Sequence, residues 1–316
     1  MPKVSVIITC YNLGQYLDEA VNSVLSQTYQ DFEILIVNDG STDDFTNGLL
    51  AAYQRAKTTV YHTENQGLPS ARNYGIERAT GEYVCCLDAD DKYHTEFLEK
   101  TVVVFEKDLE EKFGIVTTNY QLFENSTNKI DVIDFDPYIL AVENCLHVAS
   151  LFRRKCWRLV GGFAVNLSGY QDWSLWLAII ARGYKWFTIK EYLFFYRDRA
   201  GSMLKRSDKN RNEIFQLIIS NNREFYKNNF EAILKEFIVS STKNLAYIKD
   251  LLSAVDYFKS QLENTQSKLE NTQSQLDRLH LNINKILPQG SFRRRVLNYF
   301  VKQLGLLNGT IDERET

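Results

Sequence analysis

The chain has 316 residues, of which 44% are hydrophobic and 13% aromatic, so it can bury one sizeable core and still carry an appendage. Its formal net charge of -3 gives no general attraction to nucleic acid, and no basic stripe interleaved with aromatic residues is present in the first 250 residues. DNA and RNA are therefore not expected as partners. Five cysteines without a CxxC spacing predict neither a disulfide framework nor a zinc site.

Targeting signals are the next feature that the sequence bears on. The start of the chain has too short an apolar run for a signal peptide. No later segment reaches the roughly 18 apolar residues that would span a bilayer. We therefore expect a cytoplasmic protein, and the composition of its C-terminal tail, described below, adds contact with the inner face of a membrane as a further expectation.

Strand-like and helix-like segments alternate through about residue 120, which predicts an α/β fold with a mostly parallel sheet flanked by helices. The predicted strands cover residues 4–9, 32–37, 59–62 and 83–87. Apolar residues recur at helical spacing over 16–25, and again over 68–79, where Pro69 favours a helix start. Both predicted helices follow a strand and should cover the sheet.

Polar residues follow these apolar runs at the points where strands would end. Tyr11 and Asn12 follow the first run, Asp39 follows the second, and three carboxylates within 88–91 follow the fourth. Because ligands of open α/β sheets bind outside the carboxyl ends of the strands, we expect these side chains to converge. Carboxylate oxygens gathered in this way suit a divalent cation.

Six motifs, in this order and spacing, resemble those of family 2 glycosyltransferases. They are VSVIITCYN (4–12), NDGSTD (38–43), GLPSARN (67–73), DADD (88–91), GGF (161–163) and QDW (171–173). A DxD pair alone occurs by chance, whereas six ordered motifs are a specific signal. The resemblance covers roughly residues 1–205 and implies a GT-A (Rossmann-like) fold that transfers a sugar, with inversion, from a nucleoside diphosphate donor.

The resemblance assigns the metal to the DADD motif. Asp90 is the direct ligand and Asp88 touches the metal or the ribose, while Asp91 is a weaker candidate. A nucleoside diphosphate would be repelled by carboxylates alone, so these acids require Mg²⁺ or Mn²⁺ between them and the phosphates. The alternative is that the three acids cap a following helix over 94–105, where negative charge is favourable.

The resemblance assigns Asp39 to the donor base, where it accepts a hydrogen bond from uracil or another base, and Tyr11 to stacking on that base. Thr9 and Asn12 are assigned to the same nucleotide site. On local grounds, residues 38–41 are also a favourable turn, which would itself place the acid. An ordinary aromatic residue at the sheet edge is the alternative for Tyr11.

Three arginines are assigned to the donor phosphates. Arg72 lies on the helix opened by Pro69, and a guanidinium fork suits phosphate. Arg197 and Arg199 lie in a segment that resembles the mobile loop that closes over the diphosphate in related transferases, although many relatives carry histidine at the position of Arg199. The alternatives are a solvated surface arginine at position 72 and an exposed basic loop over 196–203.

Asp172 is assigned as the catalytic base, which removes a proton from the acceptor hydroxyl on the side opposite the departing diphosphate. Family members usually carry Glu before this acid, whereas this chain has Gln171, so one supporting negative charge is missing. The alternative is that Asp172 is only the first-turn acid of a buried helix.

The composition changes to helix after residue 205. Residues 206–247 are expected to form a helical linker region, and apolar residues at heptad spacing over 248–287 predict a coiled coil that joins copies of the chain into a homo-oligomer. A solvated helix, or one folded back onto the catalytic domain, is the alternative. Residues 288–316 combine a basic cluster with an apolar stripe, which is typical of peripheral membrane contact or of a small docking helix.

These patterns together predict a metal-dependent inverting glycosyltransferase of polysaccharide biosynthesis. It would move a sugar from a nucleoside diphosphate donor, preferably a UDP-sugar, to a hydroxyl of a glycan or lipid-linked glycan. The alternative from another class is a catalytically decayed transferase domain that presents the coiled coil as a scaffold. Gln171 favours this alternative, and the intact acids Asp88, Asp90 and Asp172 oppose it. A nucleotidyltransferase would need a basic site for a second triphosphate, and none is visible.

Overall fold

The computed structural model describes residues 2–199 and 210–241. The chain divides into two compact units, Met1–Lys209 and Asn210–Thr316. Three predicted regions fall wholly or partly outside the described residues: the linker region (206–247), the coiled coil (248–287) and the tail (288–316). The first unit contains every motif of the predicted site.

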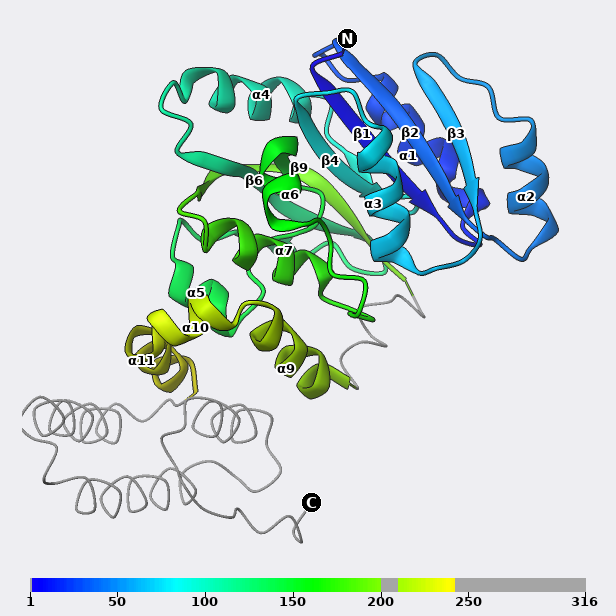
Figure 1. Ribbon diagram of the computed structural model, residues 1–316. Coiled ribbons are helices and arrows are strands. Elements are labelled where there is room, and N and C mark those ends of the chain that lie inside the picture. Colours follow the sequence, from blue (N-terminus) through cyan, green and yellow to red (C-terminus); the bar gives the residue numbers. More distant parts are fainter. Residues whose placement is uncertain (1, 200–209, 242–316) are drawn as a thin grey trace, which may run out of the picture. The chain divides into compact units, whose positions relative to one another are not determined.

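A nine-stranded sheet forms the centre of the first unit, within the described residues (Figure 1). Its strands follow the order β3-β2-β1-β4-β8-β6-β9-β5, and β7 pairs with β6. Neighbours from β3 to β4 are parallel, as are β6 and β9, whereas β5, β7 and β8 pair antiparallel. The strand bounds are Val4–Cys10 (β1), Phe32–Asp39 (β2), Thr58–Thr63 (β3), Tyr83–Asp88 (β4), Lys92–Tyr93 (β5), Phe113–Glu124 (β6), Lys129–Ile130 (β7), Leu151–Arg153 (β8) and Lys185–Asp198 (β9). The predicted α/β class is confirmed, with a sheet that becomes mixed beyond β4.

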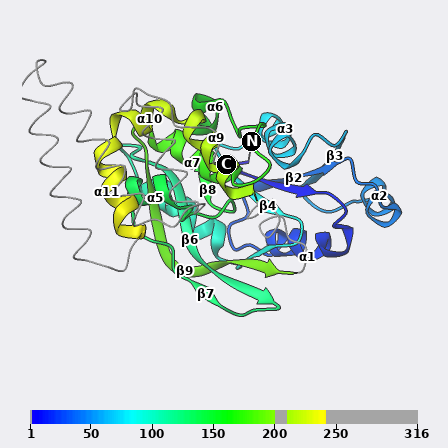
Figure 2. The same cartoon turned by 90° about the horizontal axis from the view of Figure 1, so that it is seen from below.

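Helices cover both faces of this sheet. Figure 2 shows α1 on one side of β2, and α3 with α6 and α7 on the other. The helix bounds in this unit are Gly14–Leu25 (α1), Asp44–Ala51 (α2), Leu68–Arg78 (α3), Phe97–Lys107 (α4), Pro137–Val142 (α5), Arg154–Val160 (α6) and Gln171–Ile180 (α7). The two helices predicted over 16–25 and 68–79 are confirmed.

The core lies on both sides of the central strands. Every residue of β1 is buried, as expected for a parallel strand covered on two faces. On one face α1 packs its buried Leu17 and Val21 against the sheet. On the other face α3 approaches closely through Gly75, where an added Cβ would lie 2.5 Å from Ile7 Cγ2 and 3.2 Å from Val37 Cγ2. Close packing of α3 brings its polar residues near the ends of the strands.

The parallel register brings the predicted site residues to one edge of the sheet. Thr9 pairs with Asp88 across β1 and β4, and Cys10 pairs with Asn38 across β1 and β2. The three acids of the DADD motif precede β5 and do not cap α4, whose first turn follows Glu96 without any side-chain cap. The helix-capping alternative for these acids is therefore wrong.

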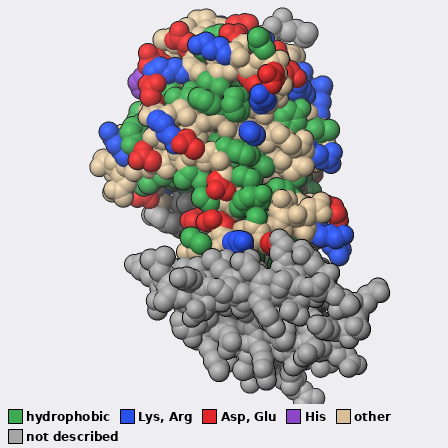
Figure 3. Space-filling model, turned by 90° about the vertical axis from the view of Figure 1, so that its left-hand side faces the viewer, with side chains coloured by type: hydrophobic (Ala, Val, Ile, Leu, Met, Phe, Trp, Pro, Cys, Tyr) green, Lys and Arg blue, Asp and Glu red, His purple; other side chains and the backbone are tan. Residues whose placement is uncertain are grey.

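The second unit is described over three helices. They are Arg211–Asn221 (α9), Arg223–Asn228 (α10) and Phe230–Ser241 (α11). Ile214, Ile218, Tyr226 and Ile233 are buried. None of the helices in the described part of the chain is long and apolar enough to cross a membrane. On the face of the molecule in Figure 3, acidic and basic side chains are interspersed among apolar ones. The coloured part of this face therefore shows no large patch of only acidic or only basic side chains.

Candidate active site

Asp88 ends β4 at the carboxyl edge of the sheet, and two neighbours orient its carboxylate. Arg72 of α3 donates to Asp88 Oδ1 at 2.7 Å, and Thr9 Oγ1 of β1 donates to the same oxygen at 3.1 Å. Arg72 is 2% exposed, so the alternative of a solvated surface arginine is wrong. Its Nε has no hydrogen-bond partner among the described residues. A buried guanidinium of this kind supplies both positive charge and an unused donor at the strand ends.

Asp90 and Asp91 crowd more negative charge into the same turn. Burial raises the pKa of Asp90, and the nearby charge of Asp88 raises it further. Asp91 is 3% exposed and accepts a hydrogen bond from Arg197 N at 2.8 Å. Burial raises the pKa of Asp91 well above its usual range, with the charges of Asp90 and Asp88 adding to the effect. Three carboxylates in four residues therefore favour a compensating cation.

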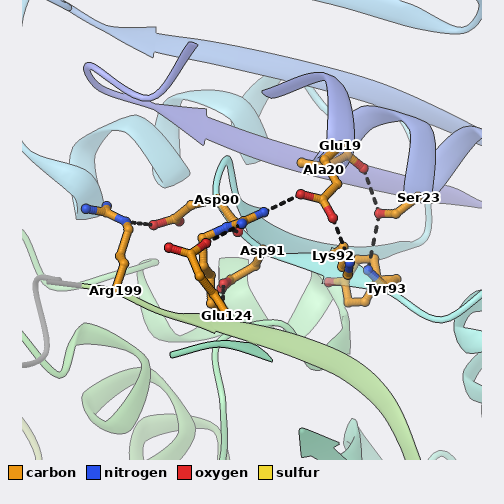
Figure 4. Close-up of polar contacts among 10 residues, drawn as sticks. Glu19, Ala20, Ser23, Asp90, Asp91, Lys92, Tyr93, Glu124 and Arg199 are labelled. Atoms are coloured by element: carbon orange, nitrogen blue, oxygen red, sulfur yellow. Dashed lines mark hydrogen bonds and ion pairs between the residues drawn. The ribbon is translucent and has the colours of Figure 1, made fainter. Parts of the chain in front are cut away.

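Arg197 lies near the end of β9 and Arg199 directly follows this strand, and both bond the DADD turn. Figure 4 shows Arg199 beside Asp90. Arg199 Nε lies 2.6 Å from Asp90 Oδ2. Arg197 pairs with Glu124 at 2.6 Å and with Glu19, and its Nε donates to the Asp90 carbonyl at 2.7 Å. Arg197 is 8% exposed and the Arg199 side chain 22%, so the alternative of an exposed basic loop does not describe these two side chains. Glu19 and Glu124 belong to no motif, and the sequence did not indicate them.

Asp39 ends β2 and lines a pocket of about 260 Å³, together with His62, Gln66 and Tyr74. Asp39 Oδ1 accepts a hydrogen bond from Gln66 N at 3.0 Å. Tyr11, beyond the end of β1, is 43% exposed. The structure thus combines a buried carboxylate with a small concave space, which is the arrangement that recognition of a nucleotide base would need.

Asn12 joins the loops that follow β1 and β2. Its backbone is left-handed, with φ of 55°, and its Oδ1 accepts from Thr42 N at 2.7 Å and Asp43 N at 3.2 Å. The predicted turn over 38–41 is present, because Asn38 Oδ1 accepts from Ser41 N at 3.0 Å. Asn12 therefore positions the loop that follows Asp39. Its side-chain amide oxygen Oδ1 already accepts two backbone hydrogen bonds from that loop.

Asp172 lies in the first turn of α7, close enough to Arg72 and Asp88 for their charges to act on its carboxylate. Trp173 N donates to its Oδ1 at 2.9 Å, and Asn144 Nδ2 lies 3.5 and 3.4 Å from its two oxygens. Burial raises the pKa of Asp172, an effect that the positive charge of Arg72 opposes and the charge of Asp88 reinforces. The same guanidinium that pairs with Asp88 thus acts on Asp172. Asn144 lies in a segment without any motif, so the sequence did not indicate it.

Gln171, at the position where the family resemblance led us to expect Glu, is 3% exposed and bonds to backbone. Its Nε2 donates to the Leu167 carbonyl at 3.3 Å. Tyr170, just before it, adopts a left-handed backbone with φ of 54°. A neutral amide is a suitable group for this buried position, because an unpaired carboxylate would be costly there. Gln171 therefore gives no structural sign of a damaged site.

Asn73 of α3 connects this helix to the segment that contains Trp157 and the GGF motif. Its Oδ1 accepts from Phe163 N at 2.8 Å and from Trp157 Nε1 at 3.0 Å, while its Nδ2 donates to the Phe163 carbonyl at 2.9 Å. Gly162 has φ of 86°, and a Cβ there would lie 2.8 Å from Asn73 Oδ1. The GGF motif and Trp157 of α6 are thus held against α3 by Asn73.

The fit of a divalent cation can be judged from the donor set. No three His, Cys, Asp or Glu side chains among the described residues converge as a complete metal cage. Mg²⁺ is often held by only one or two protein carboxylates, with water and substrate phosphates completing its shell. Asp88 and Asp90 supply two such groups, and a cation between them would offset the negative charges of these neighbouring carboxylates. The residues therefore fit a cation shared with a phosphate ligand.

Comparison with known sequences identifies the family. The profile of Glycosyl transferase family 2 matches residues 5–154. A putative teichuronic acid biosynthesis glycosyltransferase, TuaG of Bacillus subtilis, is 32% identical over 203 residues, which are 62% of this chain and 79% of that protein. An uncharacterized glycosyltransferase of Rickettsia conorii is 35% identical over 187 residues, which are 56% of this chain but 31% of that protein. This chain belongs to glycosyl transferase family 2, and it spans only about a third of the length of some curated relatives that it matches.

Comparison with solved structures supports the fold. The crystal structure of S. aureus TarS 1-349 in complex with UDP-GlcNAc superposes with a TM-score of 0.62 at 16% identity, covering 98% of this chain and 94% of that one. The mannosyltransferase PcManGT from Pyrobaculum calidifontis, in complex with GDP-Man and Mn²⁺, gives a TM-score of 0.54 at 18% identity, covering 87% and 84%. The predicted GT-A fold is confirmed.

Proposed function

We propose that this protein transfers a sugar, with inversion, from a nucleoside diphosphate donor to an acceptor hydroxyl. The observation that carries the proposal is that buried Arg72 bonds Asp88 and lies near enough to Asp172 for its charge to act there. Its guanidinium bonds Asp88 at 2.7 Å, and its charge also opposes the rise in the pKa of Asp172. An acid proposed for the donor and an acid proposed for the acceptor thus both lie within range of one guanidinium's charge, which is compatible with a direct displacement.

The donor half of the site combines Asp39, Tyr11, Arg72, Asp88 and Asp90. Asp39 would accept a hydrogen bond from the base, and the exposed Tyr11 ring would stack on it. Asp90, with Asp88, would hold Mg²⁺ or Mn²⁺, which supplies charge neutralisation for the diphosphate leaving group. The unpartnered Nε of Arg72 is a further donor for an anion. A UDP-sugar is our first candidate donor.

Asp172 is the proposed catalytic base. It would take the proton of the acceptor hydroxyl while the hydroxyl oxygen attacks the anomeric carbon and the bond to the diphosphate breaks. A carboxylate whose pKa is raised by burial is a stronger base than one in water, which favours this proton transfer. Asn144 and Trp173 N orient the carboxylate and act as positioning groups.

The acceptor and the setting are part of the same proposal. We expect a hydroxyl of a glycan or lipid-linked glycan, in a pathway of polysaccharide biosynthesis, because TuaG is named for teichuronic acid biosynthesis. We also place the protein in the cytoplasm, with self-association through residues 248–287 and membrane contact through 288–316. These two assignments rest on sequence pattern alone.

The decisive experiment is a calorimetric titration of UDP into the purified chain with and without Mn²⁺, with GDP for comparison. We expect binding of one nucleotide that depends on Mn²⁺ and that is lost in Asp90→Ala. Asp134→Ala, which removes an exposed acid elsewhere, is the matched control and should bind as the wild type does. If neither nucleotide binds the wild type, the proposal fails and a scaffold function takes its place.

A further inference from the structure

Asp90, the proposed metal ligand, already faces a cation that belongs to the protein. Arg199 Nε lies 2.6 Å from Asp90 Oδ2, and Figure 4 shows the Arg199 side chain directed at that carboxylate. The two side chains are 13% and 22% exposed, so water screens the pair only in part. A divalent cation that binds Asp90 must therefore share this carboxylate with the guanidinium or displace the guanidinium from it.

Arg197 fixes the strand end from which Arg199 emerges. Its three guanidinium nitrogens are used by Glu19 of α1, by Glu124 of β6 and by the Asp90 carbonyl. Side chains two residues apart point to the same side of an extended strand. The anchored Arg197 therefore sets the direction of Arg199 toward the DADD turn.

The two arginines differ in how readily they can move. The Arg197 guanidinium carbon lies 4.5 Å from the Tyr16 ring and 4.4 Å from the Phe123 ring, and its side chain is 9% exposed. Removing Arg197 from this position would take the bonded guanidinium from Glu124 and leave Glu19 paired with Lys92. The Arg199 side chain is more exposed, and it bonds Asp90, which is also the proposed metal ligand. Arg197 has the properties of an anchor and Arg199 those of an exchangeable group.

We propose that Arg199 is an exchangeable counter-ion: it neutralises Asp90 before a divalent cation binds, and pairs with the donor diphosphate after the cation has displaced it. Arg197 is the positioning residue that keeps Arg199 within reach of both. The pairing of Arg199 with the donor diphosphate rests on the proposed function. The exchange makes cation and nucleotide bind cooperatively, because the cation releases the guanidinium that the nucleotide then uses.

The test is Mn²⁺ titration of the full chain, without nucleotide, by calorimetry. Arg199→Gln should bind Mn²⁺ about tenfold more tightly than the wild type, the scale expected for removal of one partly buried competing ion pair. Arg199→Lys keeps the charge and should bind nearly as the wild type does. Arg182→Gln, a change at an exposed position before the start of β9, is the control for loss of one positive charge and should have no effect. Equal or weaker Mn²⁺ binding by Arg199→Gln, or no binding by any variant, would overturn the proposal.

A second titration separates this proposal from the proposed function. With saturating Mn²⁺, UDP should bind Arg199→Gln about tenfold more weakly than the wild type, because one phosphate partner is missing. If the wild type binds no UDP but Arg199→Gln still gains Mn²⁺ affinity, the donor site fails and the counter-ion role at Asp90 stands. If the wild type binds UDP with Mn²⁺ and Arg199→Gln gains no Mn²⁺ affinity, the exchange fails and the donor site stands.

Discussion

Replacement of Gly75 by Ala tests whether the close packing of α3 places Arg72. An added Cβ would lie 2.5 Å from Ile7 Cγ2, whereas carbon atoms in contact are normally about 3.5–4.0 Å apart. Either α3 must move outward by about 1 Å, or Ile7 must shift within the central strand. Overpacking costs about 1–3 kcal/mol, and the higher helix propensity of Ala offsets about 1 kcal/mol of this. We expect the free energy of unfolding to fall by up to about 2 kcal/mol.

Tryptophan fluorescence during urea unfolding is a suitable assay. The four tryptophans stand at positions 157, 173, 176 and 186, so their emission reports on the first unit alone. Gly48→Ala is the matched control, because Gly48 lies on α2 and an added Cβ there would meet nothing within 4 Å. This control should gain about 0.5–1 kcal/mol from helix propensity.

A double-mutant cycle assigns the effect to one contact. Ile7→Ala alone should lose about 2–5 kcal/mol by opening a cavity, and Gly75→Ala should then be neutral or stabilising because its methyl group enters that space. Additive effects, within about 0.5 kcal/mol, would refute the packing argument. Because displacement of α3 would also lengthen the 2.7 Å contact of Arg72 with Asp88, UDP affinity should fall in Gly75→Ala and not in Gly48→Ala.

Three further predictions concern the site and the core. Asn144→Ala removes a hydrogen-bond donor to Asp172, so the pKa of Asp172 should rise further. The acidic side of the pH profile of transferase activity should then move to higher pH, while UDP affinity stays unchanged. A pH profile that does not move would contradict the positioning role of Asn144. Asp39→Asn keeps the side-chain oxygen that accepts from Gln66 N but replaces the other oxygen with an NH₂ donor. Calorimetry should therefore show UDP affinity reduced about tenfold or more. Unchanged affinity would mean that the uracil base does not bind at Asp39. Burial lowers the pKa of His147 to about 4, so the unfolded chain binds an extra proton below about pH 6.5 and stability should fall by about 3 kcal/mol between pH 6.5 and 4. Unfolding of His147→Gln across this range should lack that slope, and an equal slope would assign it to other groups.

The position of Asp39 and Asp88 at one edge of the sheet could be predicted because it depends on the order of strands and helices along the chain. Parallel strands joined by covering helices must present their carboxyl ends together, and the apolar runs marked those ends to within two residues. The pairing of Thr9 with Asp88 is a finding of the structure, because chain order does not specify which strands are neighbours. Local patterns were sufficient here because each strand carries its own polar terminus.

The surroundings of Arg197 could not be predicted in this way. Its partner Glu19 is 178 residues distant in sequence, and neither residue type indicates burial. The sequence therefore assigned Arg197 to phosphate, whereas in the structure its guanidinium is committed to two glutamates and a carbonyl. Asn144 was missed for a related reason, because its contact with Asp172 depends on how α5 and its following loop pack, which no local pattern specifies.

The bonds of Asn73 also determine which parts of such an enzyme can be recombined. Family members that differ in acceptor are natural sources of chimeras, in which the segment from β8 onward would be grafted onto a foreign donor half. Since Asn73 bonds both Trp157 and Phe163, and the backbone at Gly162 leaves no room for a Cβ, the seam of any graft crosses these four positions. A chimera that takes Asn73 from one parent and the GGF segment from another is compatible only if both parents carry the same residues at these four positions. These positions therefore define the boundary between the parts that can be exchanged.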